Sequence, residues 1–542
     1  HHGTPPYEPG FYRNLCVNSP YRDFLKEHIE EIFELLPVDG LFLDIVSPRE
    51  CSCRHCREGM EAQGVDPSCE ASRRQYGINV LNEFMQDMSS FIRNLDERCS
   101  IFYNGGHIGP RHRASADSFT HFELESLPSG GWGYMHFPLT VRYARGLGRE
   151  CLGMTGKFHT SWGDFHSFKH PAALQFECFT MLAMNTKCSI GDQLHPRGKI
   201  CEETYELIGS VYREVEEKEP WCREARPVTE IGVFSPEEFT GSQCPPSAVG
   251  AVRILQEGAH QFDLIDTRSD FSKYKVLILP DVITVSDDLA DRIERFVAGS
   301  GALIASHHSG LNKEHNQFAL KSLGIEFQGD APYSPDFIVP KDPVAKGLKR
   351  TEYVMYLQGT HVKPVGQSTV IADVVEPYFN RTYRHFCSHR HTPSSGKVGY
   401  PGVIRNGNSI YFIHPIFAQY SKNAPYWCKQ LFLNALNMLL PNPLLIVQAP
   451  SNTVATINEQ ASHNRWVLHL LNYIPERRGE DFDIIQDILP VYGIRVSVRV
   501  PTRIREVATA PQNEALEFEQ NRERVEFTLP VLDGHQMISL TW

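Results

Sequence analysis

The chain has 542 residues, too many for one hydrophobic core, and its length predicts three or four domains, or one large domain with two smaller ones. Its 53 basic residues are outnumbered by 65 acidic ones, giving a net charge of -12, and no run of five basic residues occurs. Nucleic acid and anionic membrane surfaces are therefore disfavoured as partners. No stretch of 18 apolar residues predicts a membrane span, and the first residues, "HHGTPPYEPG", lack the parts of a secretory signal. The 14 cysteines are scattered, so we expect most to be reduced and the protein to be a cytoplasmic enzyme without an organic cofactor.

From about residue 14 to 225, short apolar runs that end in polar residues alternate with amphipathic helical stretches. The runs lie at 13–20, 40–46, 100–106, 119–126, 151–159 and 187–196, with helical patterns at 21–36 and 77–95. Strand and helix repeating in this way, with polar residues at the carboxyl ends of the strands, predict a (β/α)8 TIM-type barrel over 1–225. Only six strands are found, so we expect that the first barrel units are missing from this chain.

After "EPWCREARP" the pattern predicts a second α/β domain, of open, doubly wound type, over 226–442. It contains no glycine-rich phosphate-binding motif, so nucleotide binding is not predicted. Alternating strands from 443 to 542 predict a small C-terminal β-sandwich.

The run "GLFLDIV" contains the first candidate catalytic group. Alternation places Phe42, Asp44 and Val46 on one side of the strand, and Asp44 comes near its carboxyl end, where barrel active sites are built. The alternative is that Asp44 is a helix cap or a loop hydrogen-bond acceptor.

The run "FTHFELES" contains two more carboxyl groups. His121, Glu123 and Glu125 share one face, and the two apolar residues between them share the other, so the polar face is expected in the barrel mouth. One of the two glutamates is then a candidate acid/base that works with Asp44 across a sugar. Two carboxylates held in different protonation states are what retaining glycoside hydrolysis requires.

The remaining strand ends carry hydrogen-bond donors and flat rings, a mixture suited to sugar hydroxyls and C–H faces. Each of them could be structural when taken alone, and their concentration at strand ends is what predicts substrate binding. The candidates are Asn104, His107, His121, Trp132, Tyr134, Lys157, His159, Trp162, Asp192 and His195.

Three cysteines follow Asp44 with C-x-C-x-x-C spacing. Cys51, Cys53 and Cys56 suit tetrahedral zinc better than disulfides, with Cys16 as the fourth ligand and Cys69 as its substitute. A site closed by four thiolates would be structural. The alternative is three free thiols in a reducing compartment.

The stretches "LCVNSPYRDF" and "CSCRHC" resemble the family 42 β-galactosidases. That resemblance implies a structural zinc held by one cysteine of the first stretch and three of the second. It also implies a flavodoxin-like trimerisation domain after the barrel and a small β-domain at the end. This chain departs from family 42 on the fourth strand, where "LFLDIV" stands in place of the family's catalytic Asn-Glu pair.

A strand-four aspartate, with a glutamate upstream of "WGY", resembles the family 29 α-L-fucosidases instead. The set "DGLFLDI", "CSCRHC", "HFELESLPSGGWGY", "GMTGKFHTSWGDF" and "GDQLHP" resembles the family 151 α-L-fucosidases and their uncharacterised relatives over most of 11–440. This resemblance implies that Asp44 is the nucleophile. It makes Glu123, nine residues before Trp132, the first candidate for the acid/base and Glu125 the alternative.

Three functions follow as hypotheses: a retaining exo-α-L-fucosidase, a β-galactosidase or arabinosidase on the same scaffold, and a sugar-binding or assembly protein without catalysis. The resemblance also implies a homo-oligomer in which the second domain of one chain packs by the barrel mouth of the next. A trimer is favoured over a dimer or a hexamer, and a monomer is the alternative. The part played by the loop His385–His391 is left open.

Overall fold

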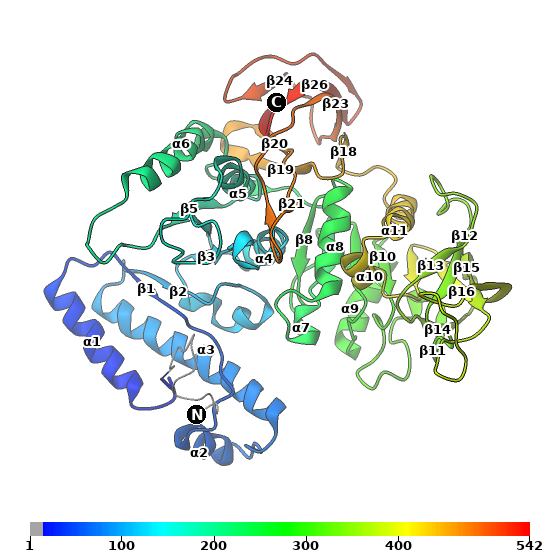
Figure 1. Ribbon diagram of the computed structural model, residues 1–542, viewed down its shortest axis with the longest axis horizontal. Helices are drawn as coiled ribbons and strands as arrows, with labels where there is room; N and C mark the ends of the chain where they lie inside the picture. Colours follow the sequence, from blue (N-terminus) through cyan, green and yellow to red (C-terminus); the bar gives the residue numbers. More distant parts are fainter. Residues whose placement is uncertain (1–14) are drawn as a thin grey trace. The chain divides into compact units, whose positions relative to one another are not determined.

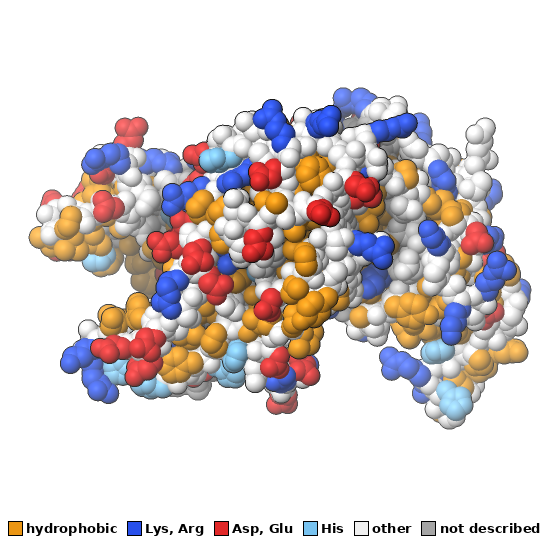
Figure 2. Space-filling view, turned by 90° about the horizontal axis from the view of Figure 1, so that it is seen from above, with side chains coloured by type: hydrophobic (Ala, Val, Ile, Leu, Met, Phe, Trp, Pro, Cys, Tyr) orange, Lys and Arg blue, Asp and Glu red, His pale blue; other side chains and the backbone are white. Residues whose placement is uncertain are grey.

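The computed structural model describes residues 15–542, which form two compact units (Figure 1). The first contains residues 15–126 with Ala144–Met154, and the second contains Leu127–Tyr143 with Thr155–Trp542. No helix within 15–542 combines the length and apolar character needed to cross a membrane. On the face shown in Figure 2, acidic and basic side chains are interspersed, so that face carries no large field of one sign.

The first unit alternates helices with short parallel strands. Its helices are α1 (Tyr21–Leu35), α2 (Arg54–Ala62), α3 (Glu70–Leu95) and the 3-10 helices η1 (Pro110–Ser118) and η3 (Arg145–Leu147). Its strands are β1 (Gly40–Leu43) paired in parallel with β2 (Ser100–Tyr103), and β3 (Phe122–Glu125) paired in parallel with β4 (Cys151–Gly156). Helix α3 buries Met85, Met88 and Ile92 along one stripe. Ser89, from the same helix, shares a 2.8 Å hydrogen bond with the hydroxyl of Tyr103, which fixes α3 against β2.

Residues 15–20 correct the strand predicted at 13–20, because they form a turn. Ser19 closes this turn by donating its backbone N–H at 3.1 Å and its hydroxyl at 2.6 Å to the carbonyl oxygen of Cys16. The Asn-Ser-Pro that follows Val17 favours a turn over the extended chain that the apolar residues alone indicate. Residues 13 and 14 lie outside the described part. The other five predicted strands are confirmed as β1 to β5, with β5 at Lys187–Gly191.

The second unit begins with short elements around a buried helix. They are η2 (Pro128–Gly130), α4 (His136–Ala144), α5 (Pro171–Ala183), β5, α6 (Glu202–Lys218) and η4 (Glu219–Trp221). Helix α5 is apolar on nearly all sides, with Leu174, Cys178 and Met181 buried. A helix of this kind must be enclosed. The hydroxyl of Thr456, on a strand of the terminal sheet, donates to the carbonyl oxygen of Ala183 at 2.6 Å and fixes one end of it.

A nine-stranded sheet forms the middle of the second unit, in the order β13-β12-β15-β16-β17-β10-β9-β7-β8. The five strands from β8 to β17 are parallel and, numbered along the chain, run 2-1-3-4-5 in space, the order of flavodoxin. The strands of this sheet are β7 (Ile231–Phe234), β8 (Phe262–Ile265), β9 (Val276–Leu279), β10 (Ala302–Ser306), β12 (Asp336–Pro340), β13 (Tyr353–Met355), β15 (Thr369–Pro377), β16 (Ser394–Asn406) and β17 (Ser409–Phe412). Other elements of this part are α7 (Glu237–Thr240), α8 (Pro246–Glu257), α9 (Asp287–Ala298), α10 (Ile416–Asn423), α11 (Tyr426–Leu439) and the antiparallel pair β11 (Ile325–Asp330) and β14 (Thr360–Pro364).

Two antiparallel sheets end the chain. One contains β18 (Leu445–Gln448), β23 (Val491–Arg499), β26 (Arg524–Leu532) and β25 (Phe518–Asn521); the other contains β24 (Glu506–Ala510), β27 (His535–Thr541), β20 (Arg465–Leu471), β19 (Val454–Gln460) and β6 (Arg226–Pro227). Val496 and Phe527 of the first sheet share a core with Ile457 and Leu468 of the second, as in a β-sandwich. The domain limits at 225/226 and 442/443 stay predictions.

Candidate active site

Asp44 and Glu125 lie at the carboxyl ends of two strands and share one hydrogen-bond donor. Asp44 follows β1, and Glu125 is the last residue of β3. The side-chain nitrogen Nδ2 of Asn104 donates to Oδ1 of Asp44 at 2.9 Å and to Oε2 of Glu125 at 3.2 Å. The two acceptor oxygens are therefore at most about 6 Å apart, a limit compatible with the roughly 5–5.5 Å between the carboxyl groups of retaining glycosidases.

Hydrogen bonds of the backbone and of the side-chain oxygen hold Asn104 in place, and they determine which way its amide nitrogen points. Its backbone N–H donates to the carbonyl oxygen of Leu43 at 2.8 Å, and its carbonyl oxygen accepts from Val46 at 2.7 Å, so β2 stays paired to β1 one residue beyond the sheet. Its side-chain Oδ1 accepts from the N–H of Gly106 at 3.1 Å. With the amide oxygen used in this way, the two N–H groups of Nδ2 must point to the carboxylates.

The surroundings of the two carboxyl groups differ. Burial raises the pKa of Glu125, the Asn104 hydrogen bond opposes this rise, and the negative charge of Asp44 adds to it. Asp44 itself is exposed. Glu125, with the raised pKa, therefore suits the part of a general acid, and the exposed Asp44 suits the part of a nucleophile.

Glu123 has a different partner. Its Oε1 lies 3.0 Å from Nε2 of His121, whose Nδ1 lies 2.9 Å from the hydroxyl of Thr120. Glu123 and Glu125 alternate with buried residues and so share a face, as predicted. The structure therefore pairs Glu123 with His121 and Glu125 with Asp44. His107, another predicted binding residue of this unit, is buried, and its part in binding stays a prediction.

Cys16, Cys51, Cys53 and Cys56 gather in one cluster, with all four sulfurs within 4.8 Å of one another. The sulfur of Cys16 lies 3.5, 3.7 and 3.6 Å from those of Cys56, Cys51 and Cys53. Four thiolates at about 2.3 Å from a tetrahedral zinc ion would be spaced about 3.8 Å apart, so these residues fit the ion. The hydrogen bond with Cys56 lowers the pKa of Cys16 to about 5, against the opposing effect of burial.

The surroundings of this cluster agree with a closed structural site. Met60, Tyr76 and Val80 pack around the sulfurs. Cys69, the substitute ligand considered from the sequence, is exposed at the start of α3 and is not among the clustered cysteines.

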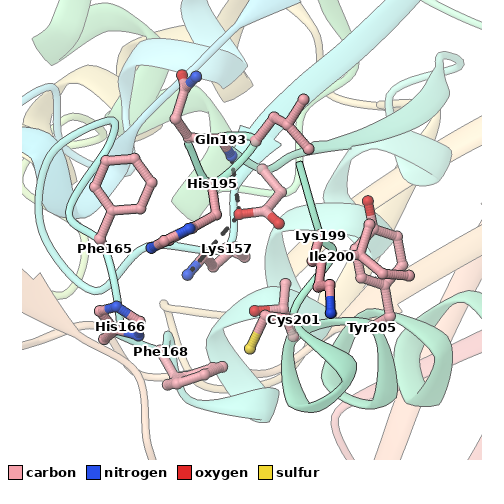
Figure 3. A pocket seen from close by; sticks show the side chains of 13 residues that line it. Lys157, Phe165, His166, Phe168, Gln193, His195, Lys199, Ile200, Cys201 and Tyr205 are labelled. Carbon is pink, nitrogen blue, oxygen red and sulfur yellow. Dashed lines mark hydrogen bonds and ion pairs between the residues drawn. The ribbon is translucent and has the colours of Figure 1, made fainter. Parts of the chain in front are cut away.

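A pocket of about 140 Å³ lies in the second unit, between the segments that follow β4 and β5 and the start of α6 (Figure 3). Three predicted binding residues, Lys157, Asp192 and His195, line it together. Nζ of Lys157 lies 3.9 Å from Oδ1 of Asp192, which also accepts from the N–H of Gln193 at 2.8 Å. The structure therefore brings these three residues to one place.

The segment from 157 to 169, which forms one wall of the pocket, is closed at its base. The N–H of Lys169 donates to the carbonyl oxygen of Lys157 at 2.8 Å. Nζ of Lys169 lies 2.7 Å from Oε2 of Glu177 and 3.1 Å from the hydroxyl of Thr155. The Thr155 hydroxyl in turn donates to Oε2 of Glu177 at 2.6 Å. The Lys169–Glu177 ion pair is buried on both sides, so its separation would leave an uncompensated charge.

Four other predicted residues of the second unit do not line this pocket. Trp162 lies beside it and donates from Nε1 to the side chain of Gln193 at 3.1 Å. Trp132 packs on His136, Tyr134 on Phe176, and His159 on Phe482, with ring centroids 4.8, 5.6 and 5.8 Å apart. Burial, followed by the negative charge of Glu177, raises the pKa of Tyr134.

Sequence reasoning missed most of the residues that line the pocket, among them Phe165, His166, Phe168, Lys199, Thr204 and Tyr205. The first three stand in "FHSFK", in the segment that follows β4, and this density of rings is a signal that could have found them. Lys199 and Tyr205 offered none, because they lie beside the pocket only through the course of the chain into α6.

Comparisons with known proteins place the chain among glycoside hydrolases. The structure of α-L-fucosidase isoenzyme 2 from Paenibacillus thiaminolyticus matches with a TM-score of 0.94 and 39% identity, over 99% of this chain and 82% of that one. This chain belongs to the family of that enzyme. A β-galactosidase from Bacillus circulans sp. alkalophilus matches with a TM-score of 0.70 and 15% identity, over 97% of this chain and 83% of that one, which shows the fold alone. The predicted fold class, a barrel-type α/β region followed by further domains, is confirmed by these matches.

The second predicted domain also matches a family model. Residues 253–328 match the β-galactosidase trimerisation domain. Among curated proteins, β-galactosidase GanA of Bacillus subtilis is 32% identical over 123 residues, and β-galactosidase BbgII of Bifidobacterium bifidum is 31% identical over 92. These matches cover 22% and 16% of this chain but only 18% and 13% of the two relatives.

Proposed function

We propose that this glycoside hydrolase family member is a retaining exo-α-L-fucosidase that removes terminal fucose. The observation that carries the proposal is the Asn104 bridge, which holds Asp44 and Glu125 at a spacing suited to a nucleophile and an acid/base. The α-L-fucosidase relative supports the choice of sugar.

In the proposed reaction, Oδ2 of Asp44 attacks the anomeric carbon. Oδ1 already accepts hydrogen bonds from Asn104 and from the N–H of Ile45, whereas Oδ2 accepts none from the described residues 15–542. Protonated Glu125 gives its proton to the glycosidic oxygen as the bond to the leaving group breaks. Ionised Glu125 then takes a proton from water, which attacks the same carbon and returns Asp44 as a carboxylate. Two displacements retain the anomeric configuration.

A panel of nitrophenyl glycosides tests the sugar. We expect the α-L-fucoside to be hydrolysed with the highest kcat/KM, and proton NMR to detect α-L-fucose as the first product. A preference for β-galactoside or an arabinoside would replace fucose with the second hypothesis. No turnover of any glycoside by the folded protein would favour a sugar-binding or assembly role.

A comparison of Glu125→Gln with Glu123→Gln tests the acid/base. The raised pKa of Glu125 means that the acid is protonated, and the enzyme active, below that pKa, and that activity falls as pH rises through it. We expect Glu125→Gln to remove this alkaline fall and to slow fucosides with poor leaving groups by about 10²–10⁴-fold, while sparing a dinitrophenyl fucoside. The same behaviour in Glu123→Gln instead would assign the acid/base to Glu123.

We also propose that the four clustered cysteines hold one structural zinc ion. Metal analysis of the purified protein should then give about one zinc per chain. Cys53→Ser should lower both zinc content and Tm, while the activity per folded molecule stays near that of wild type; Cys69→Ser is the matched control. A metal-free preparation with an unchanged Tm would contradict this site.

The trimerisation-domain match supports a homo-oligomer, and we propose a trimer, with a dimer or hexamer as alternatives. Light scattering at micromolar concentration should give a mass of several chains. A mass near the 61.6 kDa of one chain, with unchanged specific activity on dilution, would contradict assembly.

A further inference from the structure

The ammonium group of Lys157 lines the pocket in Figure 3 and has donors that no side chain or backbone group of the described residues fills. The Lys157 side chain is 5% exposed, and its Nζ points into the pocket. It donates to the carbonyl oxygen of Ser167 at 3.2 Å, while the carboxylate of Asp192 lies 3.9 Å away and the rings of Phe158 and Phe168 lie 4.7 and 4.9 Å away. An ammonium group has three donors, so Lys157 can bind an oxygen-rich group in the pocket.

The start of α6 supplies a second polar group without a filled set of hydrogen bonds in the described part of the chain, the hydroxyl of Thr204. Thr204 is the third residue of this 17-residue helix, lines the pocket and is 0% exposed. Within residues 15–542, its hydroxyl oxygen has no hydrogen-bond partner. The first N–H groups of a helix are free of intrahelical partners and carry the positive end of the helix dipole. The first turn of α6 also contains Glu202 and Glu203. The unpartnered buried hydroxyl of Thr204, and not the helix terminus alone, is therefore what points to a ligand in the pocket.

The charges that line the pocket favour an anion as well. Lys199 approaches from the α6 side (Figure 3) and forms no ion pair with a described residue. The rings of His166 and His195 lie 5.9 Å apart and offer further donors. Asp192 is the one acidic residue among those that line the pocket, and it faces Lys157.

We propose that this pocket binds a tetrahedral oxyanion, the sulfate or phosphate group of a substituted sugar. Lys157, Lys199 and the hydroxyl of Thr204 hold its oxygens. The exposed rings and aliphatic side chains at the rim, such as Phe165 and Ile200, contact the C–H surface of the sugar. The sugar part of this ligand rests on the proposed function, whereas the oxyanion part does not.

Inorganic sulfate and inorganic phosphate are the probes. Each is titrated into the full chain by calorimetry and by Tm, at constant ionic strength set with sodium chloride. Thr204→Val keeps the shape of the side chain and removes the hydroxyl, and Lys199→Gln removes an exposed charge. We expect each substitution to weaken binding about tenfold or more. Lys313→Gln, at an exposed lysine in a loop outside the pocket, should bind like wild type.

Stronger binding of sulfate than phosphate would identify a sulfated ligand, and the reverse a phosphorylated one; either supports the proposal. Equal affinity in wild type and both pocket variants would overturn it, since the ions would then bind elsewhere. Acetate binding more tightly than both ions, or L-fucose binding equally well to wild type and both variants without any oxyanion binding, would also overturn it. Oxyanion binding without hydrolysis of any fucoside would refute the proposed function and leave this site standing.

Discussion

An aspartate follows a parallel strand both in the barrel-type region and in the nine-stranded sheet, but only the first of the two is accessible to a ligand. Asp44, after β1, is exposed and keeps Oδ2 free of hydrogen bonds with described residues. Asp281, after β9, is 1% exposed and uses both oxygens, accepting from the hydroxyl of Ser306 and from the N–H of Ala418, each at 2.7 Å. A strand-end carboxylate is thus a candidate for chemistry only where one oxygen is left for a substrate.

The two His–carboxylate pairs differ in the same way. His414 lies 2.7 Å from Asp336, both side chains are 1% exposed, and the other oxygen of Asp336 accepts from the hydroxyl of Tyr400 at 2.6 Å. His121 and Glu123 are 3.0 Å apart but 29% and 15% exposed. Residue type and distance are similar in the two pairs, and burial separates the internal one from the accessible one.

The largest effect is expected from Asp44→Asn. Loss of a covalent nucleophile should lower kcat for a nitrophenyl fucoside at least about a thousand-fold, with the circular dichroism spectrum unchanged. Asp281→Asn, the matched change at the buried strand end, should leave kcat near wild type. Equal losses in the two variants would abolish the distinction between these strand ends.

A second substitution compares the two histidine pairs by stability. Asp336→Ala removes both acceptors from a buried network and should lower the free energy of unfolding by about 3–5 kcal/mol. Glu123→Ala breaks the more accessible pair and should cost about 1 kcal/mol or less. Thermal unfolding of the two variants beside wild type measures the difference. Destabilisation of similar size would show that burial does not separate these pairs.

The last prediction concerns pH. Burial raises the pKa of Asp281 to about 7, against the opposing hydrogen bond of Ser306. An unfolded aspartate titrates near pH 4, so between about pH 4 and 7 the folded state holds a proton that the unfolded chain has lost. The contribution of Asp281 to the free energy of unfolding is therefore fully present below about pH 4 and is lost as pH rises through about 7. The loss is on the order of a few kcal/mol.

The Tm of Asp281→Asn should fall less than that of wild type between pH 5 and 8, because asparagine has no proton to lose. Asp44→Asn serves as the control and should follow the wild-type slope. Parallel slopes for Asp281→Asn and wild type would contradict the raised pKa.

Much of the fold was predictable because its signals are local. Strands β1 to β5 and the helical stripe of Met85, Met88 and Ile92 follow from apolar spacing that the backbone geometry imposes. The C-x-C-x-x-C spacing likewise places three thiols in one loop, and Cys16 joins them as the resemblance implied. The strand predicted at 13–20 is wrong over residues 15–20, because Ser19 donates two hydrogen bonds to the carbonyl oxygen of Cys16 and closes a turn there.

The sequence by itself determined which chemistries the chain can supply: carboxylates at strand ends, a thiol cluster and rings that suit a sugar. Only the tertiary structure decided that Glu125, and not Glu123 two residues earlier on the same face, lies with Asp44, because Asn104 comes from a separate strand to join them. It also decided that Lys199 and Thr204 line one pocket with Lys157. The physical reason is that spacing along a strand is set by covalent geometry. Proximity and desolvation, by contrast, depend on which distant segments pack together, and these two quantities set the protonation state and accessibility on which catalysis and binding depend.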